Sequence, residues 1–289
     1  GGENMRFKAK QKKVLLFIVA ISIILFAFFN WQNNSIIISE MVFKNDTIPE
    51  AFKGYKILQI SDLHNKEFGS KQNKILAKIE KINPDIIVVT GDLIDSNNTN
   101  IDIAMELISG AIKIAPIYYV SGNHEAWSGS YDELKSNLEN SGVVVLDNQK
   151  IEVMNDSDSI DIIGLADTSF IESDWLEYGG NAETKNLLNT LTEGTTNFKI
   201  LLSHRPELFD IYSNSNVNLI FSGHAHGGQF RLPFIGGLIA PDQGFFPKLT
   251  EGIHTSNDTS MIISRGLGNS IIPVRILNRP ELIVVTLSK

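Results

Sequence analysis

The sequence predicts a large α/β domain carried on a single N-terminal membrane-spanning helix. Three observations support this class: short apolar runs that end in glycine or polar residues, amphipathic stretches between them, and one long uncharged apolar run near the N-terminus. Such short runs are typical of buried strands, and the stretches between them are typical of crossover helices. A chain of 289 residues is long enough for one such domain and an N-terminal appendage.

The first element that we expect is a membrane anchor at residues 14–31. Residues 14–29 are apolar and uncharged, and a basic tail at residues 1–13 precedes them. The run falls short of the roughly 20 residues of a typical spanning helix, but flanking residues extend it. Because basic flanks stay in the cytoplasm, we expect a single-pass protein of the cell membrane with its main domain outside the cytoplasm. The alternative is a cleaved signal peptide, for which Phe28-Phe29-Asn30-Trp31 is a poor cleavage site.

The rest of the chain divides into a linker with a first strand at residues 32–54 and the main domain at residues 55–289. Within this domain we expect strands at 56–61, 86–89, 117–120, 199–202 and 218–222. We expect helices at 71–81, 102–113, 131–140, 183–191 and 206–212. This alternation predicts βαβ units with parallel strands, at least through the first half of the domain.

Five of the six histidines lie in short polar blocks that follow these strands directly. The blocks are Asp62-Leu63-His64, Gly91-Asp92, Gly122-Asn123-His124-Glu125, Ser203-His204 and Gly223-His224-Ala225-His226. Sites in open α/β sheets lie at the carboxyl ends of the strands, so the fold is expected to bring the blocks together. A lone histidine is more often a surface or hydrogen-bonded residue. Side chains two apart, however, point the same way in an extended chain, as Asp62 and His64 would.

Histidine, carboxylate and amide groups together are the ligands that divalent metals use, and we interpret the blocks as a two-metal hydrolytic site. The mixed ligand set favours two Mn²⁺ ions, with Fe or Zn²⁺ as alternatives, over a Ca²⁺ cage. The chain has no cysteine, which excludes a cysteine nucleophile and cysteine-bound zinc. It also lacks the glycine-rich phosphate loop and the Gly-x-Ser-x-Gly nucleophile elbow.

The order and spacing of the blocks resemble those of the calcineurin-like metallophosphoesterase superfamily, from about Lys56 to the C-terminus. Further motifs are similar to its membrane-associated bacterial branch, which includes YkuE-like proteins and UDP-diacylglucosamine pyrophosphohydrolases. These motifs are Ser203-His204-Arg205-Pro206, the run from Gly223 to Pro233, and Ser264-Arg265-Gly266-Leu267-Gly268. The resemblance implies an αββα sandwich, in which two mixed β-sheets are flanked by helices.

The resemblance also implies a role for each residue of the site. One metal would be held by Asp62, His64 and His226, and the other by Asn123, His204 and His224, with Asp92 bridging the two. His124 would contact phosphate or protonate the leaving oxygen, and Asp95 would orient His124. For His124 the alternative is structural support of its loop, and for Asp95 it is a turn-forming aspartate.

These observations predict a binuclear phosphoesterase that cleaves a phosphodiester or pyrophosphate bond of a small substrate, with lipid-linked phosphates among the candidates. The first alternative is a phosphomonoesterase acting on phosphoproteins or nucleotides. The second is a non-catalytic, metal-loaded sensor of the cell envelope. The net charge of −8, despite the basic tail, argues against a nucleic-acid duplex as partner.

An apolar segment after His226 admits two interpretations. Its apolar residues are Phe230, Leu232, Pro233, Phe234, Ile235, Leu238, Ile239, Phe245, Phe246 and Pro247. They would form an apolar wall for an acyl or isoprenyl chain, or would fill the core or hold a loop in place; the general burial of apolar residues favours the second interpretation for most of them. Arg231 and Arg265 would offer positive charge to a phosphate or diphosphate, although solvated surface arginines are the more common case.

Overall fold

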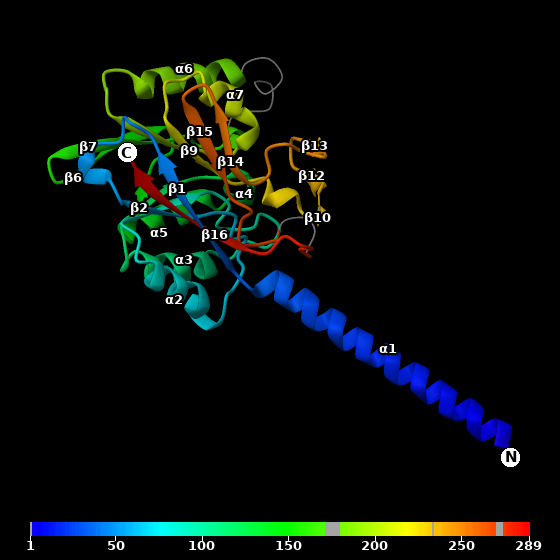
Figure 1. Cartoon of the computed structure of the whole chain (residues 1–289). Coiled ribbons are helices and arrows are strands. Elements are labelled where there is room, and N and C mark those ends of the chain that lie inside the picture. The colour runs from blue at the N-terminus through cyan, green and yellow to red at the C-terminus, as the bar shows by residue number, and fades with distance from the viewer. Residues whose placement is uncertain (1, 171–179, 233, 270–273) are drawn as a thin grey trace.

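A computed structural model describes residues 2–170, 180–232, 234–269 and 274–289. Two six-stranded sheets lie face to face and helices cover their outer faces (Figure 1). This is the predicted αββα sandwich with mixed sheets. Pro233 of the apolar segment lies outside the described residues.

The first sheet has the strand order β1-β16-β2-β3-β4-β5. Its strands are β1 (Ile37–Lys44), β2 (Lys56–Ile60), β3 (Ile86–Thr90), β4 (Ile117–Val120), β5 (Val144–Val145) and β16 (Glu281–Ser288). Strands β2 to β5 run parallel, while β16 pairs antiparallel with β2 and parallel with β1. The predicted boundary at residue 55 therefore falls within this sheet, since β1 precedes it.

The second sheet has the order β14-β15-β9-β8-β7-β6. Its strands are β6 (Gln149–Asn155), β7 (Asp158–Gly164), β8 (Phe198–Leu202), β9 (Leu219–Ser222), β14 (Gly252–Ser256) and β15 (Thr259–Ile263). Strands β7, β8, β9 and β15 are parallel, and antiparallel β6 and β14 close the two edges. Two small hairpins, β10 (Arg231–Leu232) with β11 (Gly236–Gly237) and β12 (Ile239–Ala240) with β13 (Gly244–Phe245), follow β9.

Alternate side chains of each central strand enter different apolar layers, because successive residues of a strand point to opposite faces. In β3, Ile86 and Val88 lie between the two sheets, whereas Ile87 and Val89 face the helices. In the same way, Ile200 of β8 lies between the sheets and Leu201 faces the helices on the other side. Both faces of these strands are buried, which explains their nearly continuous apolar sequences.

The helices lie where the amphipathic stretches predicted them, with ends shifted by a few residues. The first sheet is covered by α2 (Asn73–Ile82), α3 (Ile101–Ala111) and α5 (Tyr131–Asn140), and the second by α6 (Gly180–Thr192) and α7 (Phe209–Tyr212). The helix predicted at 206–212 is a 3₁₀ turn, Pro206–Leu208, that leads into α7. A further short helix, α4 (Asn123–Ser128), begins within the third polar block.

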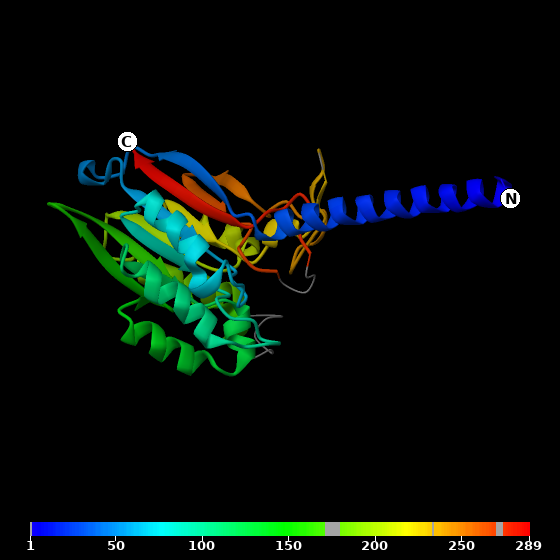
Figure 2. The ribbon, with the colours of Figure 1, turned by 90° about the horizontal axis from the view of Figure 1, so that it is seen from below.

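Helix α1 (Gly2–Asn34) projects from the sandwich and includes the predicted anchor at 14–31 (Figures 1 and 2). Residues Arg6–Asn34 are long and apolar enough to cross a membrane by length and composition. None of the described residues of the apolar segment is buried, so they do not fill the core, and five of their side chains are exposed. These residues are Leu232, Phe234, Ile235, Phe245 and Phe246.

Candidate metal centre

The predicted ligands converge at the ends of strands from both sheets. Asp62 and His64 follow β2, Asp92 follows β3, and Asn123 begins α4 directly after β4. His204 follows β8, and His224 and His226 follow β9. All seven side chains are buried. The two sheets are joined behind them by Gln59, whose Nε2 donates to the Ser222 carbonyl at 2.8 Å and to Thr90 Oγ1 at 3.0 Å.

The backbone is strained at five of the predicted ligands. Their φ angles are positive: 52° at Asp62, 47° at His64, 53° at Asp92, 64° at His224 and 47° at His226. Residues other than glycine rarely adopt such angles, and strain of this kind concentrates at functional sites.

Two of the motif glycines allow the chain segments to approach this closely. A Cβ atom at Gly122 would lie 2.3 Å from Asp92 Oδ1, and one at Gly223 would lie 2.0 Å from Ser61 Oγ. Both distances are far below van der Waals contact, so side chains at these positions would displace the loops that carry Asp92 and Asp62.

The structure brings together one group formed by Asp62, His64, Asp92 and His226, whose candidate ligand atoms all lie within 4.8 Å of one another. His226 Nε2 lies 3.4 Å from Asp62 Oδ1 and 3.1 Å from His64 Nε2. His64 Nε2 lies 3.5 Å from Asp92 Oδ2. Two carboxylates and two imidazoles thus face a common point, as the ligands of a divalent cation do.

A second group contains Asp92, His204 and His224, again within 4.8 Å. His204 Nε2 lies 3.2 Å from Asp92 Oδ2, 3.0 Å from Asn123 Oδ1 and 3.1 Å from His224 Nδ1. Asp92 Oδ2 therefore belongs to both groups. A single carboxylate between two clusters of donor atoms is the arrangement that a bridging ligand needs.

Hydrogen bonds around the second group fix which ring nitrogens are free to bind a metal. His204 Nδ1 lies 2.7 Å from the Thr90 carbonyl, which only accepts, so Nδ1 carries the proton. His224 Nε2 lies 2.9 Å from the Asp242 carboxylate and donates to it in the same way. In the neutral rings, the lone pairs of His204 Nε2 and His224 Nδ1 then face each other and Asp92. These lone pairs repel unless a cation lies between them, so the donor set fits a metal ion.

The charge distribution leads to the same conclusion. Burial lowers the pKa of His204, but the neighbouring Asp92 carboxylate outweighs burial and raises it to about 10. Burial raises the pKa of Asp92, yet His204 and His64 bring it well below its usual range. The buried Asp92 carboxylate thus stabilises a positive charge placed beside it, which is what a bridging ligand must do for metal ions.

His124 lies beside His64 of the first group, with ring centroids 4.4 Å apart, and its ring is held in one tautomer. The Ser96 backbone N–H donates to His124 Nδ1 at 3.1 Å, which leaves the proton of the neutral ring on Nε2. Asp95 Oδ2 is 3.7 Å from His124 Nδ1 and 3.5 Å from His64 Nδ1. Asp95 is thus near His124, as expected, but beyond hydrogen-bond distance, and the Ser96 amide orients the ring more directly.

Sequence reasoning gave no role to Glu125, which anchors the whole loop after β3. Its buried carboxylate accepts from the backbone N–H groups of Gly122 at 2.7 Å, Asp92 at 2.8 Å, Leu93 at 2.8 Å and Ile94 at 3.3 Å. The available signal was an acid three residues after Gly122 at the start of a helix, which is the capping-box spacing. Asp242, the partner of His224, lies in a hairpin turn and had no such signal.

The geometry agrees with sequence comparisons. The profile of the calcineurin-like phosphoesterase family matches residues 55–228. The chain belongs to this family. It is 32% identical over 258 residues to the uncharacterized metallophosphoesterase YkuE of Bacillus subtilis, covering 86% of this chain and 84% of that protein. It is 24% identical to the phosphodiesterase YaeI of Escherichia coli, covering 85% and 84%. It is 29% identical to a transmembrane protein with a metallophosphoesterase domain from Danio rerio, covering 84% of this chain and 55% of that protein.

As a calcineurin-like phosphoesterase, the protein is a metal-dependent hydrolase of phosphate esters. A cleft of about 730 Å³ opens onto its candidate metal centre. Besides the predicted site residues, the cleft is lined by Ser96, Asn97, Trp127, Pro241 and Asp242. Trp127 is 59% exposed, and its ring lies 5.5 Å from that of His124, so a flat aromatic surface borders the position where a leaving group would lie.

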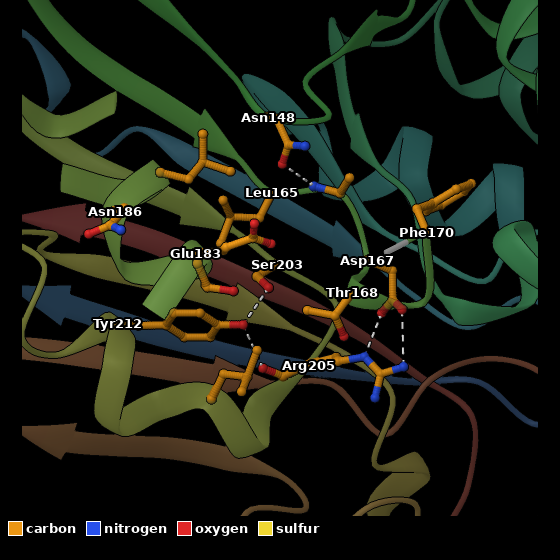
Figure 3. Close-up of a pocket in the computed structure, with 14 residues that line it drawn as sticks. Asn148, Leu165, Asp167, Thr168, Phe170, Glu183, Asn186, Ser203, Arg205 and Tyr212 are labelled. Carbon is orange, nitrogen blue, oxygen red and sulfur yellow. Dashed lines mark hydrogen bonds and ion pairs between the residues drawn. The ribbon is translucent and has the colours of Figure 1, made fainter. Parts of the chain in front are cut away.

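A second cavity of about 580 Å³ adjoins the metal centre through Arg205 (Figure 3). The Arg205 guanidinium binds Asp167 through two bonds of 2.9 and 3.0 Å, and its Nη1 donates to Asp242 at 2.8 Å. Asp242 therefore accepts hydrogen bonds from both Arg205 and His224. Tyr212 donates its hydroxyl proton to the Arg205 carbonyl at 3.0 Å, which fixes the turn that follows His204.

Arg231 and Arg265 do not behave as solvated surface arginines. Both pair with Glu251, and Arg265 also lies 3.9 Å from Glu281. Neither lines the cleft at the metal centre. Their charges are already neutralised by these acids, so they are poorly suited to bind a phosphate there.

Proposed function

We propose that the protein hydrolyses phosphodiester or pyrophosphate bonds of small substrates, including lipid-linked ones, at a centre of two divalent metals. Asp62, His64 and His226 hold one ion in this proposal, and Asn123, His204 and His224 hold the other. Asp92 bridges them. The observation that carries the proposal is Asp92 Oδ2, which lies 3.5 Å from His64 Nε2 and 3.2 Å from His204 Nε2, and so is common to both groups.

Two bound divalent cations supply Lewis acidity and a hydroxide near neutral pH. The protein's own residues orient the metal ligands and supply the proton for the leaving oxygen. Thr90 and Asp242 accept from His204 and His224, so that in the neutral rings the lone pairs lie on His204 Nε2 and His224 Nδ1, the nitrogens that would bind the metal. His124, with its Nε2 proton, donates to the leaving oxygen, a role for which the Ser96 amide selects the correct tautomer.

Three features support the identity of the metal, the kind of phosphate bond and the location at the membrane. The mixed nitrogen and oxygen donor set suits Mn²⁺, with Fe or Zn²⁺ as alternatives. The phosphodiesterase name of the Escherichia coli relative supports an internal phosphate. The apolar run of α1, which follows basic residues in the first part of the same helix, supports a domain outside the cytoplasm and a substrate at the membrane.

The test compares bis(p-nitrophenyl) phosphate with p-nitrophenyl phosphate as substrates of the purified full chain, with Mn²⁺ or with a chelator. We expect Mn²⁺-dependent cleavage that favours the diester, and loss of activity in Asp92→Asn. The matched control is Asp258→Asn, in the exposed turn between β14 and β15, which should retain full activity. Preference for the monoester would indicate a phosphomonoesterase. No turnover of either ester with both metals bound would favour the non-catalytic sensor.

A further inference from the structure

Exposed apolar side chains gather at one end of the domain. Outside α1, the described residues include eleven large apolar side chains that are exposed, and six of them belong to the two small hairpins and the neighbouring loop. We call these six the apolar rim: Leu232, Phe234, Ile235, Phe245, Phe246 and Leu277. The other five are spread over β1, α4, β6, β14 and a 3₁₀ turn at 168–170. A cluster of this kind is characteristic of an interaction surface.

The exposure within the rim is extensive. Phe234 is fully exposed, and Phe245 and Phe246 are 78% and 65% exposed. Phe245 lies in β13, paired with Ile239, and exposed Lys248 follows two residues after Phe246. Neighbouring aromatic and basic side chains are typical of segments that enter the interface between lipid headgroups and acyl chains.

The rim lies at the end of the domain from which α1 leaves. In both views the hairpins are at the α1 end of the sandwich, and the hairpin of β6 and β7 is at the opposite end (Figures 1 and 2). The connection is also direct. Phe230 forms a β-bridge with Ile276, and the Arg231 N–H donates to the Ile276 carbonyl at 3.1 Å, so β10 is attached to the loop that carries Leu277.

The loop that carries Leu277 also contacts the C-terminal end of α1. Arg279 lies over the Trp31 ring at 4.6 Å and donates to the Ser35 carbonyl at 3.0 Å. The Arg275 N–H donates to Asn33 Oδ1 at 2.8 Å, and Lys66 donates to the Asn33 carbonyl. These contacts couple the direction of α1 to the domain. When α1 spans a bilayer, these contacts therefore orient the domain so that the rim faces the bilayer surface from which α1 emerges.

We propose that the apolar rim inserts into the lipid bilayer in which α1 is anchored, and that it holds the metal-centre cleft against the membrane surface. The turn between β12 and β13 carries Pro241 and Asp242, which line the cleft, so the same hairpin that presents Phe245 also borders the metal centre. The bilayer is the occupant because the rim lies at the end of the domain from which the apolar helix α1 leaves. The inference rests on the membrane anchoring proposed above, and it is independent of which phosphate ester is cleaved.

The absence of cysteine makes a direct test available. Single-cysteine variants of the full chain are labelled with an environment-sensitive fluorophore and reconstituted into vesicles of phosphatidylcholine and phosphatidylglycerol, with or without nitroxide-labelled lipid. Phe234→Cys and Phe245→Cys place the probe in the rim. Met154→Cys is the matched control, because Met154 is also an exposed apolar residue but lies in β6 at the opposite end. Leu16→Cys reports insertion of α1.

We expect blue-shifted emission at both rim positions, with quenching by nitroxide lipid several-fold greater than at Met154. Adding Phe246→Glu should reduce the quenching at position 234, because a carboxylate opposes insertion. Turnover of a soluble phosphate ester, unchanged in each labelled variant, verifies the fold.

Three outcomes would overturn the proposal. If the probe at Leu16 is quenched while the rim probes remain as accessible as that at Met154, α1 is inserted in the bilayer but the rim is not. If the probe at Leu16 is not quenched, the anchoring itself fails. If the rim probes are shielded only at high protein density and not quenched by nitroxide lipid, the rim binds a second copy of the chain.

Discussion

Replacing Glu125 by glutamine tests whether this side chain holds the loop that presents Asp92. The carboxylate accepts four backbone N–H groups, two on each oxygen. A glutamine amide keeps one acceptor oxygen, so either orientation leaves two buried N–H groups without a partner. At about 1–3 kcal/mol for each such group, the cost is about 2–6 kcal/mol. Burial and the nearby Asp92 raise the pKa of Glu125 to about 7. Removing the charge therefore relieves a desolvation cost, and we expect the lower part of that range.

The assay is thermal unfolding of Glu125→Gln together with a Mn²⁺ titration of activity. A loss of about 2–3 kcal/mol lowers the unfolding midpoint by several degrees. We also expect metal affinity to fall by about 10-fold to 100-fold, as for other residues that support ligands. Glu139→Gln, in an exposed part of α5, serves as the matched control. If the two variants have equal midpoints and equal Mn²⁺ dependence, Glu125 does not position the loop and this reasoning is wrong.

Three other changes probe the surroundings of the metal centre. Asp242→Asn weakens the acceptor of His224 Nε2–H and should lower the affinity for Mn²⁺ by about 10-fold or more; an unchanged activity titration would contradict this role. Trp127→Ala removes the aromatic border of the cleft and should raise KM for aryl diesters more than it lowers kcat, whereas equal kinetics would place the substrate elsewhere. Metal removal by a chelator should lower the unfolding midpoint, because an ion at 100 times its Kd stabilises the folded state by about 2.7 kcal/mol. A midpoint unaffected by the chelator would argue against metal binding to the folded state.

The local sequence was sufficient for the central strands and for the position of the candidate ligands along the chain. A strand buried on both faces must be apolar at successive positions, as Ile86 to Val89 are, and this signal needs no knowledge of the partner strands. Loop residues directly after such strands are carried to one edge of the sheet. The convergence of Asp62 and Asp92, which follow neighbouring strands of the first sheet, was therefore predictable before the structure, whereas His204 approaches them from the second sheet.

The N-terminal helix was also evident, because a long uncharged run flanked by basic residues is a local pattern. The chain order of the polar blocks further indicated the calcineurin-like family, which the family profile then confirmed.

Contacts between distant segments were decided only by the tertiary structure. Strand β1 pairs with β16, joining Ile37 to Glu281, and no periodicity near either residue encodes that partner. The support of His224 by Asp242 and the exposure of Phe245 depend on how a hairpin folds over the site. Sequence periodicity records which side of an element is apolar. Whether an apolar side is covered, and by what, depends on the packing of segments that lie far apart along the chain.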